Sequence, residues 1–479
     1  MVSVFTGFLF LVMVTRSLSQ SNFGLWEFIV DVLVFASFPV GYFTYWATRE
    51  VARGAVIGKT TQVLCILMSA GGVVLYLVFS LGTYASIGSS FTPFIAALIL
   101  VPLTYWTLSN IALVQGHNPA IQAYSLMVSE PAKLLVAYPL LYVYHLGING
   151  VILSVAVAYL VQATVSTIQL RDVRKDRIDL NKGKEWLGFY QVPSIYAVTY
   201  VLGVADTFVA SISSHGTVLT GAYQAAFQVA TIVGYSSYLS IALYPLLLRG
   251  KSERLPGQVL EFALLFGIPM ATGSIALAPR ILYLLKPAYV GSTTALVLLS
   301  LASVATLVSG VIDQTLMGRE RADLEVEDKS KKILRSDLMF VPAANTTYFV
   351  VYLTAVFLIA RASVASSMPV SEFATYWALS QLLLLCGLVV GKMVKLLRKT
   401  SMTLTVSSLY YVVASAAMGA ALYFASGDVV HSGEGTLDYG LRLIGLVVVG
   451  ACIYFGLLFA VDSKFRSVAK AVLKMLKGS

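Results

Sequence analysis

The chain has 479 residues, of which 58% are hydrophobic and only 12% are Asp, Glu, Lys or Arg. A soluble domain carries about 25% charged residues, so this chain has too little polar surface to cover its apolar volume. It is predicted to be a polytopic membrane protein. Its formal charge of +10 would suggest a nucleic-acid partner for a soluble protein, but a basic excess in a membrane protein indicates cytoplasmic loops. We therefore expect no nucleic-acid partner.

Apolar runs separated by short polar segments predict fourteen membrane-spanning helices of about 20 residues each. The runs lack the two-residue alternation of transmembrane strands, so the predicted fold class is all-α. The first run is too short for a hydrocarbon core of about 30 Å. We expect a translation start upstream of Met1 or, less favoured, a first helix without a full inner turn. The predicted spans are 2–15, 25–47, 60–82, 91–112, 122–144, 150–170, 187–212, 217–247, 258–278, 291–317, 338–360, 370–391, 402–425 and 440–461.

Basic residues are distributed unevenly among the predicted loops. The loops that follow even-numbered spans, together with the C-terminal tail, contain 27 of the 33 Lys and Arg residues. Cytoplasmic loops are enriched in Lys and Arg, so both termini are predicted to be cytoplasmic. We expect a multi-pass protein of the cell (plasma) membrane.

The loops also suggest how the chain is organised. We predict an N-terminal six-helix lobe with a basic connecting loop at 1–186, a second six-helix lobe at 187–400, and two extra spans at 401–462. Residues 463–479 place apolar side chains on one face and lysines on the other. This pattern is typical of a helix that lies on anionic membrane lipids, and a frayed terminus is an equal alternative.

No catalytic or metal-binding motif is recognisable. Cys65, Cys386 and Cys452 lie in apolar runs without paired spacing, and the four histidines are scattered in or beside loops. The sequence has no G-x-x-x-x-G-K-S/T phosphate loop, so ATP hydrolysis is not expected to drive the protein. We expect no enzyme activity and no resident cofactor, with Na⁺ or H⁺ as the candidate coupling ion.

Two turns in the chain resemble each other. In the turn before span two, Gly24 precedes Trp26 by two positions, and in the turn before span eight, Gly221 precedes Tyr223 by two positions. Equivalent positions six spans apart predict two repeats related by an axis along the membrane normal.

These turns and several other segments resemble the Wzx-type polysaccharide-biosynthesis flippases of the multidrug/oligosaccharidyl-lipid/polysaccharide (MOP) exporter superfamily. The resemblance covers most of the chain, although spans thirteen and fourteen match by position only and the short first span departs from the family. The matching segments are 15–26 (TRSLSQSNFGLW), 48–54 (TREVARG), Asp206, 221–226 (GAYQAA), 244–246 (YPL), 288–291 (AYVG) and 316–319 (LMGR).

The resemblance implies two six-helix lobes around a V-shaped cavity, followed by two extra helices. It also implies a function. Such a flippase carries an isoprenoid-(di)phosphate-linked oligosaccharide from the cytoplasmic to the outer leaflet by alternating access, for surface polysaccharide or glycoprotein assembly. The implied partners are that lipid-linked oligosaccharide and other polysaccharide-assembly proteins.

A diphosphate that crosses the bilayer needs cations at suitable depths, and the planar fork of Arg suits it best. Arg49, Arg53 and Arg249 stand where orientation alone requires positive charge, so a purely topological role is the favoured alternative for them. Arg16 lies at the predicted outer end, against that trend, and is therefore more informative. The candidate substrate-binding residues are Arg16, Arg49, Arg53, Lys133 and Arg249.

Two other intramembrane charges have structural alternatives. Lys133 is the only Lys inside a predicted span, and Glu130 lies one turn away on the same face. We expect either an ion pair that permits burial or a role in substrate binding or coupling. Asp313, near the inner end of span ten, is expected to cap its helix or to pair with Arg319.

The remaining candidates are acids. Glu27 and Asp31 are four residues apart on span two and share a face, as in a proton or Na⁺ relay, although a water-facing rim is the slightly favoured alternative. Asp206 lies deeper and matches the acid of the family's helix seven. The candidate ion-coupling residues are therefore Asp206, Glu27, Asp31 and Glu130.

Two other functions are weighed against the flippase. A cation-coupled exporter of small amphiphiles from the same superfamily would move cationic dyes in exchange for Na⁺ or H⁺. A polytopic saccharide polymerase or ligase would need a sizeable outer loop. The longest predicted outer loop, 426–439, has about 14 residues, so an enzyme is the weaker alternative.

Overall fold

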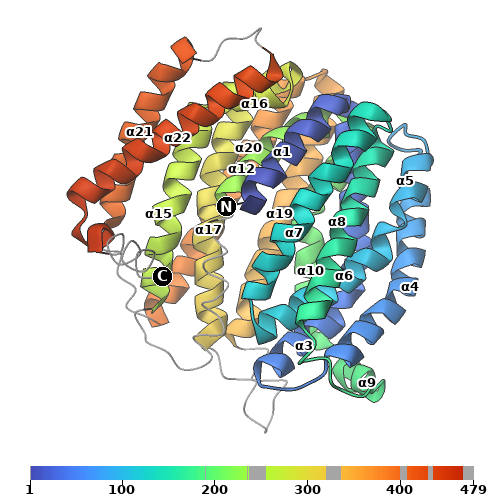
Figure 1. Ribbon diagram of the computed structural model, residues 1–479. Helices are drawn as coiled ribbons and strands as arrows, with labels where there is room; N and C mark the ends of the chain where they lie inside the picture. The colour runs from blue at the N-terminus through green and yellow to red at the C-terminus, as the bar shows by residue number, and fades with distance from the viewer. Residues whose placement is uncertain are drawn as a thin grey trace. The chain divides into compact units, whose positions relative to one another are not determined.

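Helices account for every regular element in the described part of the computed structural model, which confirms the all-α fold class (Figure 1). Within the described residues, eleven helices are long and apolar enough to cross a membrane, and a bent helix pair and two shorter apolar helices accompany them. Each coincides with one predicted span, so the chain is a multi-pass membrane protein. The structure describes residues 2–188, 190–234, 236, 255–319, 336–399, 407–429 and 435–467.

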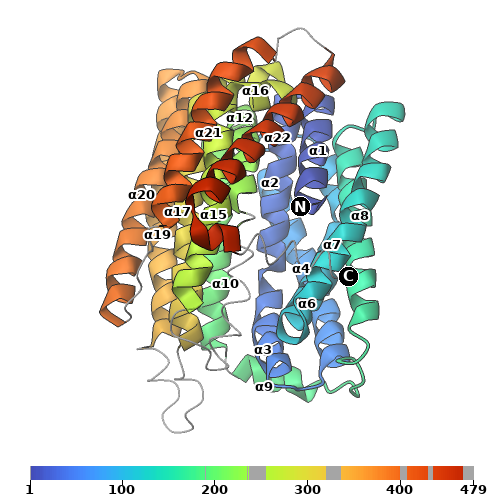
Figure 2. The same ribbon diagram turned by 60° about the vertical axis from the view of Figure 1, so that its left-hand side comes forward.

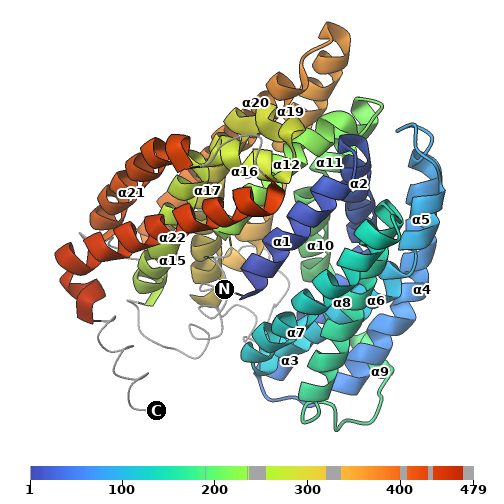
Figure 3. The same cartoon turned by 45° about the horizontal axis from the view of Figure 1, so that its top comes forward.

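The first compact unit consists of Met1–Gln224 and Met339–Ala374. Helix α6 packs against α4, α8 and α3, and α7 packs against α8 (Figure 3). Helix α12 (Val218–Gly234) begins in this unit, and most of α19 (Asp337–Ser366) belongs to it. Its other helices are α1 (Val2–Ser17), α2 (Gln20–Ser37), η1 (Phe38–Val40), α3 (Gly41–Ala52), α4 (Gly58–Thr83), α5 (Thr92–Ala97), α6 (Leu100–His117), α7 (Ala120–Tyr138), η2 (Pro139–Val143), α8 (Ile148–Gln169), α9 (Asn181–Gly188), α10 (Gln191–Gly203) and α11 (Asp206–Ser213).

The second compact unit consists of Ala225–Leu338 and Thr375–Ser479. Helices α21 and α22 pack against each other and against α15 (Figure 2). The Tyr454 hydroxyl of α22 donates to the Leu265 carbonyl of α15 at 2.8 Å. The two extra spans are therefore an integral part of this unit. Its helices are α15 (Leu255–Ala276), α16 (Ala278–Leu285), η4 (Pro287–Ser292), α17 (Thr293–Arg319), most of α20 (Val370–Lys399), α21 (Ser407–Val429) and α22 (Thr436–Val461).

The predicted lobe boundaries describe six-helix repeats rather than packing units, and they stay a prediction. The amphipathic tail predicted at 463–479 lies mostly outside the described residues, which end at position 467.

The second span is longer than predicted and is not a uniform helix. It runs from Gln20 to Ala52 as α2, η1 and α3. The Ser19 side chain caps its first turn by accepting a hydrogen bond from the Asn22 N–H at 3.1 Å. Pro39 lies in the short 3₁₀ turn η1, because a proline has no N–H to continue the α-helical ladder. Glu27 and Asp31 lie between these two features, and Arg49 follows them in the last turn of α3.

The seventh span is broken rather than continuous. Helices α10 and α11 meet at an angle of 50°, and Val204 and Ala205 separate them. Phe208 of α11 stacks on Phe28 of α2 with ring centroids 5.2 Å apart, and Phe35 packs edge-on at 4.8 Å. These aromatic contacts hold the short helix α11 against α2. A break inside an apolar span exposes backbone groups that need partners, because lipid supplies none.

Candidate functional site

Two carboxylates satisfy the backbone at the break in the seventh span. Asp206 is the first residue of α11, and its Oδ1 accepts the N–H of Thr207 at 2.9 Å. Asp31 of α2 reaches the same helix start, where its Oδ2 accepts the N–H of Phe208 at 2.9 Å. Unsatisfied N–H groups and the positive end of the helix dipole favour anions at this point. The sequence predicted both acids, and the structure brings them to one place.

Tyrosines complete this cluster. The Tyr352 hydroxyl of α19 donates to Asp206 Oδ2 at 2.8 Å, and the Tyr223 hydroxyl of α12 lies 3.4 Å from that of Tyr352. Tyr348, one turn earlier on α19, stacks on Tyr352 with centroids 5.8 Å apart. Asp31, Asp206, Tyr223 and Tyr352 are hereafter the acid–tyrosine cluster. It gathers residues from four helices of the first unit, all of them buried.

Glu27 belongs to the surroundings of this cluster. Asp31 interacts electrostatically with both Glu27 and Asp206. Glu27 is only 8% exposed and Asp31 only 7%, so the slightly favoured prediction of a water-facing rim was wrong for this pair. Helix α11 and its aromatic contacts cover the acids, which could not be read from α2 alone. Within the described residues, no group of three or more His, Cys, Asp or Glu side chains could hold a metal ion.

The tyrosine partners were missed at the sequence level. Tyr348 and Tyr352 are four residues apart and therefore lie on one helical face, and this spacing was the available signal. Such pairs are common in apolar helices, and only the tertiary packing shows that this face meets Asp206. In the sequence, Tyr223 stands out only as the aromatic residue two positions after Gly221.

The candidate arginines lie at opposite ends of one span. Arg16 is in the last turn of α1, just before the span from Gln20 to Ala52 begins, and Arg49 is in its last turn. At 1.5 Å per residue these two positions are roughly 45 Å apart, so they cannot contact one diphosphate at the same time. Arg53 follows α3 as its C-cap and is exposed. Arg249 lies outside the described residues.

Arg49 is buried among aromatic rings. Its Nη1 donates to the Tyr45 hydroxyl at 3.2 Å, and the guanidinium lies 5.5 Å from the centre of the Tyr45 ring. Tyr45 also packs against Tyr196 of α10, with centroids 5.5 Å apart. A loop cation that only fixes orientation would extend into water. Arg49 is therefore packed inside the unit, and its predicted role in substrate binding stays a prediction.

Lys133 and Glu130 form the predicted ion pair on α7. The Lys133 Nζ lies 2.9 Å from Glu130 Oε1 and 2.8 Å from Oε2, and 4.6 Å from the centre of the Phe10 ring of α1. Both side chains are largely shielded. The pair neutralises both charges and permits burial, which is the first of the two predicted roles. A role in substrate binding or coupling stays a prediction.

The prediction that Lys133 is the only intraspan lysine was wrong. Helix α20 continues to Lys399, and Lys392 lies inside it with an exposed fraction of 1%. Its Nζ donates to Asp313 Oδ2 and Ser309 Oγ of α17, both at 2.8 Å. Asp313 thus pairs with Lys392, and its predicted cap or pair with Arg319 stays a prediction because the Arg319 side chain lies outside the described residues. A run of basic residues after an apolar stretch concealed the continuing helix.

A glycine seam joins the two similar turns. Gly24 of α2 and Gly221 of α12 lie against each other, with no room for a side chain on either. A Cβ on Gly24 would collide with the Thr217 carbonyl oxygen, and one on Gly221 with the Gln20 carbonyl oxygen. Ser21 Oγ and Thr217 Oγ1 are 3.0 Å apart across the seam. The glycines matched in sequence therefore meet in space.

Comparison with known proteins gives a fold but no sequence family. No family model matches the chain, and no curated protein matches its sequence. Solved structures do match. The lipid II flippase MurJ, in an inward closed conformation, is 13% identical, with a TM-score of 0.59 over 95% of this chain and 98% of its own.

Two other solved transporters match over a smaller share of the chain. A multidrug resistance MATE family transporter of the MOP superfamily, in an inward-facing conformation, is 13% identical, with a TM-score of 0.58 over 83% of this chain and 96% of its own. A MOP superfamily transporter from Pyrococcus furiosus is 13% identical, with a TM-score of 0.52 over 82% of this chain and 95% of its own. The chain therefore shares the fold of these three solved structures.

Proposed function

We propose that this protein is a flippase of the Wzx type, which moves an isoprenoid-(di)phosphate-linked oligosaccharide from the cytoplasmic to the outer leaflet. The supporting observation is the length of the structural match. The lipid II flippase covers 95% of the chain, whereas the MATE transporter covers 83%. The difference is about the length of two membrane spans with their loops. The lipid II flippase therefore accounts for more of this chain than the multidrug transporter does.

The arginines at the two ends of the second span suit successive contacts with one phosphate group. Arg49 and Arg53 stand at the end that is cytoplasmic by the positive-inside rule, and Arg16 at the other end. A diphosphate is stabilised by the Arg fork wherever water is scarce. We propose that the substrate meets Arg49 on entry and Arg16 before release. The lipid tail stays in the bilayer throughout.

The acid–tyrosine cluster is the proposed coupling site for H⁺ or Na⁺. Two buried carboxylates at a broken helix provide oxygen ligands, and protonation of Asp206 would remove the charge that accepts the Tyr352 hydroxyl. Asp31 lies seven residues after Gly24 on α2, about 10 Å along the helix axis. Binding at the cluster can therefore change how α2 packs at the glycine seam. Glu130 remains a candidate coupling residue through its pair with Lys133.

The decisive experiment is deletion of the gene in its own organism, followed by analysis of lipid-linked saccharides in each leaflet. We expect the precursor to accumulate in the cytoplasmic leaflet and the surface glycan to be lost. Replacing Arg16 or Arg49 with Gln should impair export at unchanged protein abundance. Normal surface glycan without accumulation of the precursor, in a strain that lacks a second flippase, would rule the proposal out.

A cysteine pair tests whether the seam opens during transport. The side-chain oxygens of Ser21 and Thr217 are 3.0 Å apart, so Ser21→Cys and Thr217→Cys together bring two sulfurs within reach of a disulfide. Oxidation should stop transport, and reduction should restore it. The single-cysteine variants are the controls. Full transport with a quantitative cross-link would show that the seam stays closed throughout the cycle.

The second candidate is a cation-coupled exporter of small amphiphiles, which the likeness to the MATE transporter favours. Purified protein in liposomes should then exchange a cationic dye for Na⁺ or H⁺. We expect no such exchange. Dye movement that is abolished by Asp206→Asn would favour this candidate over the flippase.

A further inference from the structure

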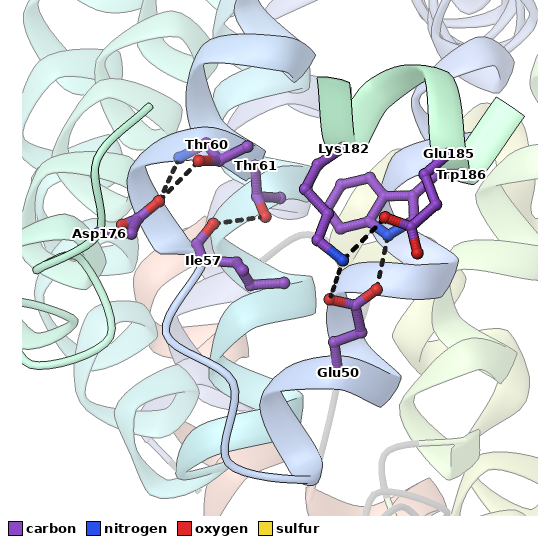
Figure 4. Close-up of polar contacts among 8 residues, drawn as sticks. All are labelled: Glu50, Ile57, Thr60, Thr61, Asp176, Lys182, Glu185 and Trp186. Atoms are coloured by element: carbon purple, nitrogen blue, oxygen red, sulfur yellow. Dashed lines mark hydrogen bonds and ion pairs between the residues drawn. The ribbon is translucent and has the colours of Figure 1, made fainter. Parts of the chain in front are cut away.

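The connector between α8 and α10, residues 171–188, is fixed to the end of α3 and the start of α4 in the first unit. The Trp186 side chain is buried, and its Nε1 donates to Glu50 Oε1 at 2.7 Å, while Lys182 Nζ lies 3.6 Å from Glu50 Oε2 (Figure 4). Asp176 Oδ2 accepts the N–H of Thr60 at 2.9 Å and its hydroxyl at 2.7 Å. These contacts anchor the connector to α3 and to the start of α4.

Every acid in the connector has an internal partner. Asp176 caps α4, and Asp179 Oδ1 accepts the N–H of Asn181 at 2.9 Å. Asp172 pairs with Lys175 at 2.7 Å, and Glu185 pairs with Lys182 at 2.9 Å. The hydrogen bond from Lys175 lowers the pKa of Asp172. The hydrogen bond between Lys182 and Glu185 raises the pKa of Lys182. Two of these four negative charges are thus paired with lysines of the connector, and the other two are held by N–H groups.

Three cations remain without an acidic partner. No acidic side chain in the described part of the chain pairs with Arg174, Arg177 or Lys184. Arg177 and Lys184 are exposed and Arg174 is half-buried. A further cation, Arg171, is also exposed, next to Asp172. The outer surface of the anchored connector is therefore positively charged.

The same segment exposes aliphatic side chains. Ile178, Leu180 and Leu187 have exposed fractions of 55%, 54% and 42%. Large apolar side chains beside Lys and Arg are the composition of segments that lie at the boundary between lipid headgroups and acyl chains. An aqueous loop would gain nothing from exposing them.

The connector also lies at the correct level for the membrane surface. It follows the last residue of α8, Gln169, and precedes α10, which begins at Gln191. Its anchors are the end of α3 at Ala52 and the start of α4 at Gly58. Four membrane-spanning segments therefore end beside it, and by the positive-inside rule this is the cytoplasmic side.

We propose that the connector binds anionic phospholipids of the cytoplasmic leaflet. Arg174, Arg177 and Lys184 contact lipid phosphates, while Ile178, Leu180 and Leu187 insert beside the first carbons of the acyl chains. The anchors on Glu50 and Thr60 make the surface preorganised, so that binding does not require the segment to fold. This proposal goes beyond the transported substrate and does not depend on it.

The test compares lipid retention by two variants of the full chain in nanodiscs of phosphatidylglycerol and phosphatidylcholine. One variant carries Arg174→Gln, Arg177→Gln and Lys184→Gln, and the matched control carries Asp172→Asn and Lys175→Gln, an internal pair. A basic residue near an anionic surface contributes about fivefold in affinity. We expect the triple variant to bind phosphatidylglycerol at least about tenfold more weakly than wild type, and the control to bind like wild type.

A second measurement is independent of these variants. An environment-sensitive fluorophore on Ile178→Cys, with the other three cysteines replaced, should shift to the blue in phosphatidylglycerol vesicles and return on addition of salt, because salt screens surface charges. The proposal is overturned if a folded triple variant binds phosphatidylglycerol as wild type does, or if the control variant loses as much binding as the triple variant. It is also overturned if the fluorophore has the same spectrum in phosphatidylglycerol and in phosphatidylcholine vesicles.

Discussion

The two ends of the span from Gln20 to Ala52 are held by opposite means. At its start, the backbone of α2 meets α12 at Gly24 and Gly221, and side chains are excluded. At its end, α3 is held through Glu50, which accepts the Trp186 N–H and faces the Lys182 ammonium. The first contact consists of close backbone packing, and the second of charged side chains beside water.

This difference indicates which end can separate. Among the described residues the glycine seam holds no ion pair, and the long side chain that crosses it, Gln20, is neutral and donates to the Val218 carbonyl at an exposed position. Its two surfaces can therefore part and close again without leaving an unpaired charge. The Glu50 network uses a buried Trp and a charged pair, and removing one partner would leave the other unsatisfied. We therefore expect the seam to be the mobile end and the connector network the fixed one.

The largest effect is expected from Gly24→Ala and Gly221→Ala. Each new methyl group would meet a backbone carbonyl that cannot rotate away, and overpacking of this kind costs about 1–3 kcal/mol or more. The apparent melting temperature in detergent should fall, and the Ser21–Thr217 cysteine cross-link should become slower. Gly41→Ala in the same span is the control, because nothing lies within 4 Å of its added Cβ. Equal stability of all three variants would contradict the seam.

The next effect is expected from Tyr352→Phe. The variant removes the hydroxyl that Asp206 accepts, and a hydrogen bond to a charged group contributes about 1.5–3 kcal/mol. Transport should fall severalfold, with a shift in its dependence on pH or Na⁺. Tyr348→Phe keeps the stacked ring without touching this bond and serves as the control. If ion dependence is unchanged in Tyr352→Phe, the acid–tyrosine cluster is not the coupling site.

A smaller effect is expected at the opposite end from Trp186→Phe. The substitution keeps an aromatic ring but removes the Nε1 donor to Glu50, and the loss should be about 1 kcal/mol because Lys182 still faces Glu50. Protease cleavage within residues 171–188 should accelerate while the Ser21–Thr217 cross-link is unaffected. A cross-link that changes as much as in Gly24→Ala would show that the two ends are not independent.

The smallest effect is expected from Lys175→Gln. Lys175 lowers the pKa of the exposed Asp172 carboxyl, so the pair stabilises the folded state above the ordinary Asp pKa and loses this contribution as the pH falls through the lowered value. Exposed pairs contribute little. The melting temperature of the variant should therefore equal that of the wild-type protein at both pH 7 and pH 3. A clear loss at pH 7 would mean that the connector depends on this pair.

Apolar runs predicted every span because lipid requires each backbone polar group to be satisfied within a helix. Span ends were less predictable. Lys392 looked like a loop cation, because the sequence does not show that Asp313 and Ser309 of α17 lie within 2.8 Å to accept its ammonium. Similarly, the break after Gly203 was not predicted, because Val204 and Ala205 are apolar and Asp206 was interpreted as an acid inside a continuous span rather than as the start of a new helix.

The sequence by itself determined that the protein lies in a membrane, that its fold class is all-α, and which spans and intramembrane charges follow one another along the chain. These properties follow from composition and local periodicity. The tertiary structure alone decided which charges are partners. It placed Asp31 and Asp206 on one helix start, brought Tyr352 to Asp206, and paired Lys392 with Asp313. Such contacts join residues that are far apart in the chain, and local sequence carries no record of which helical faces will meet.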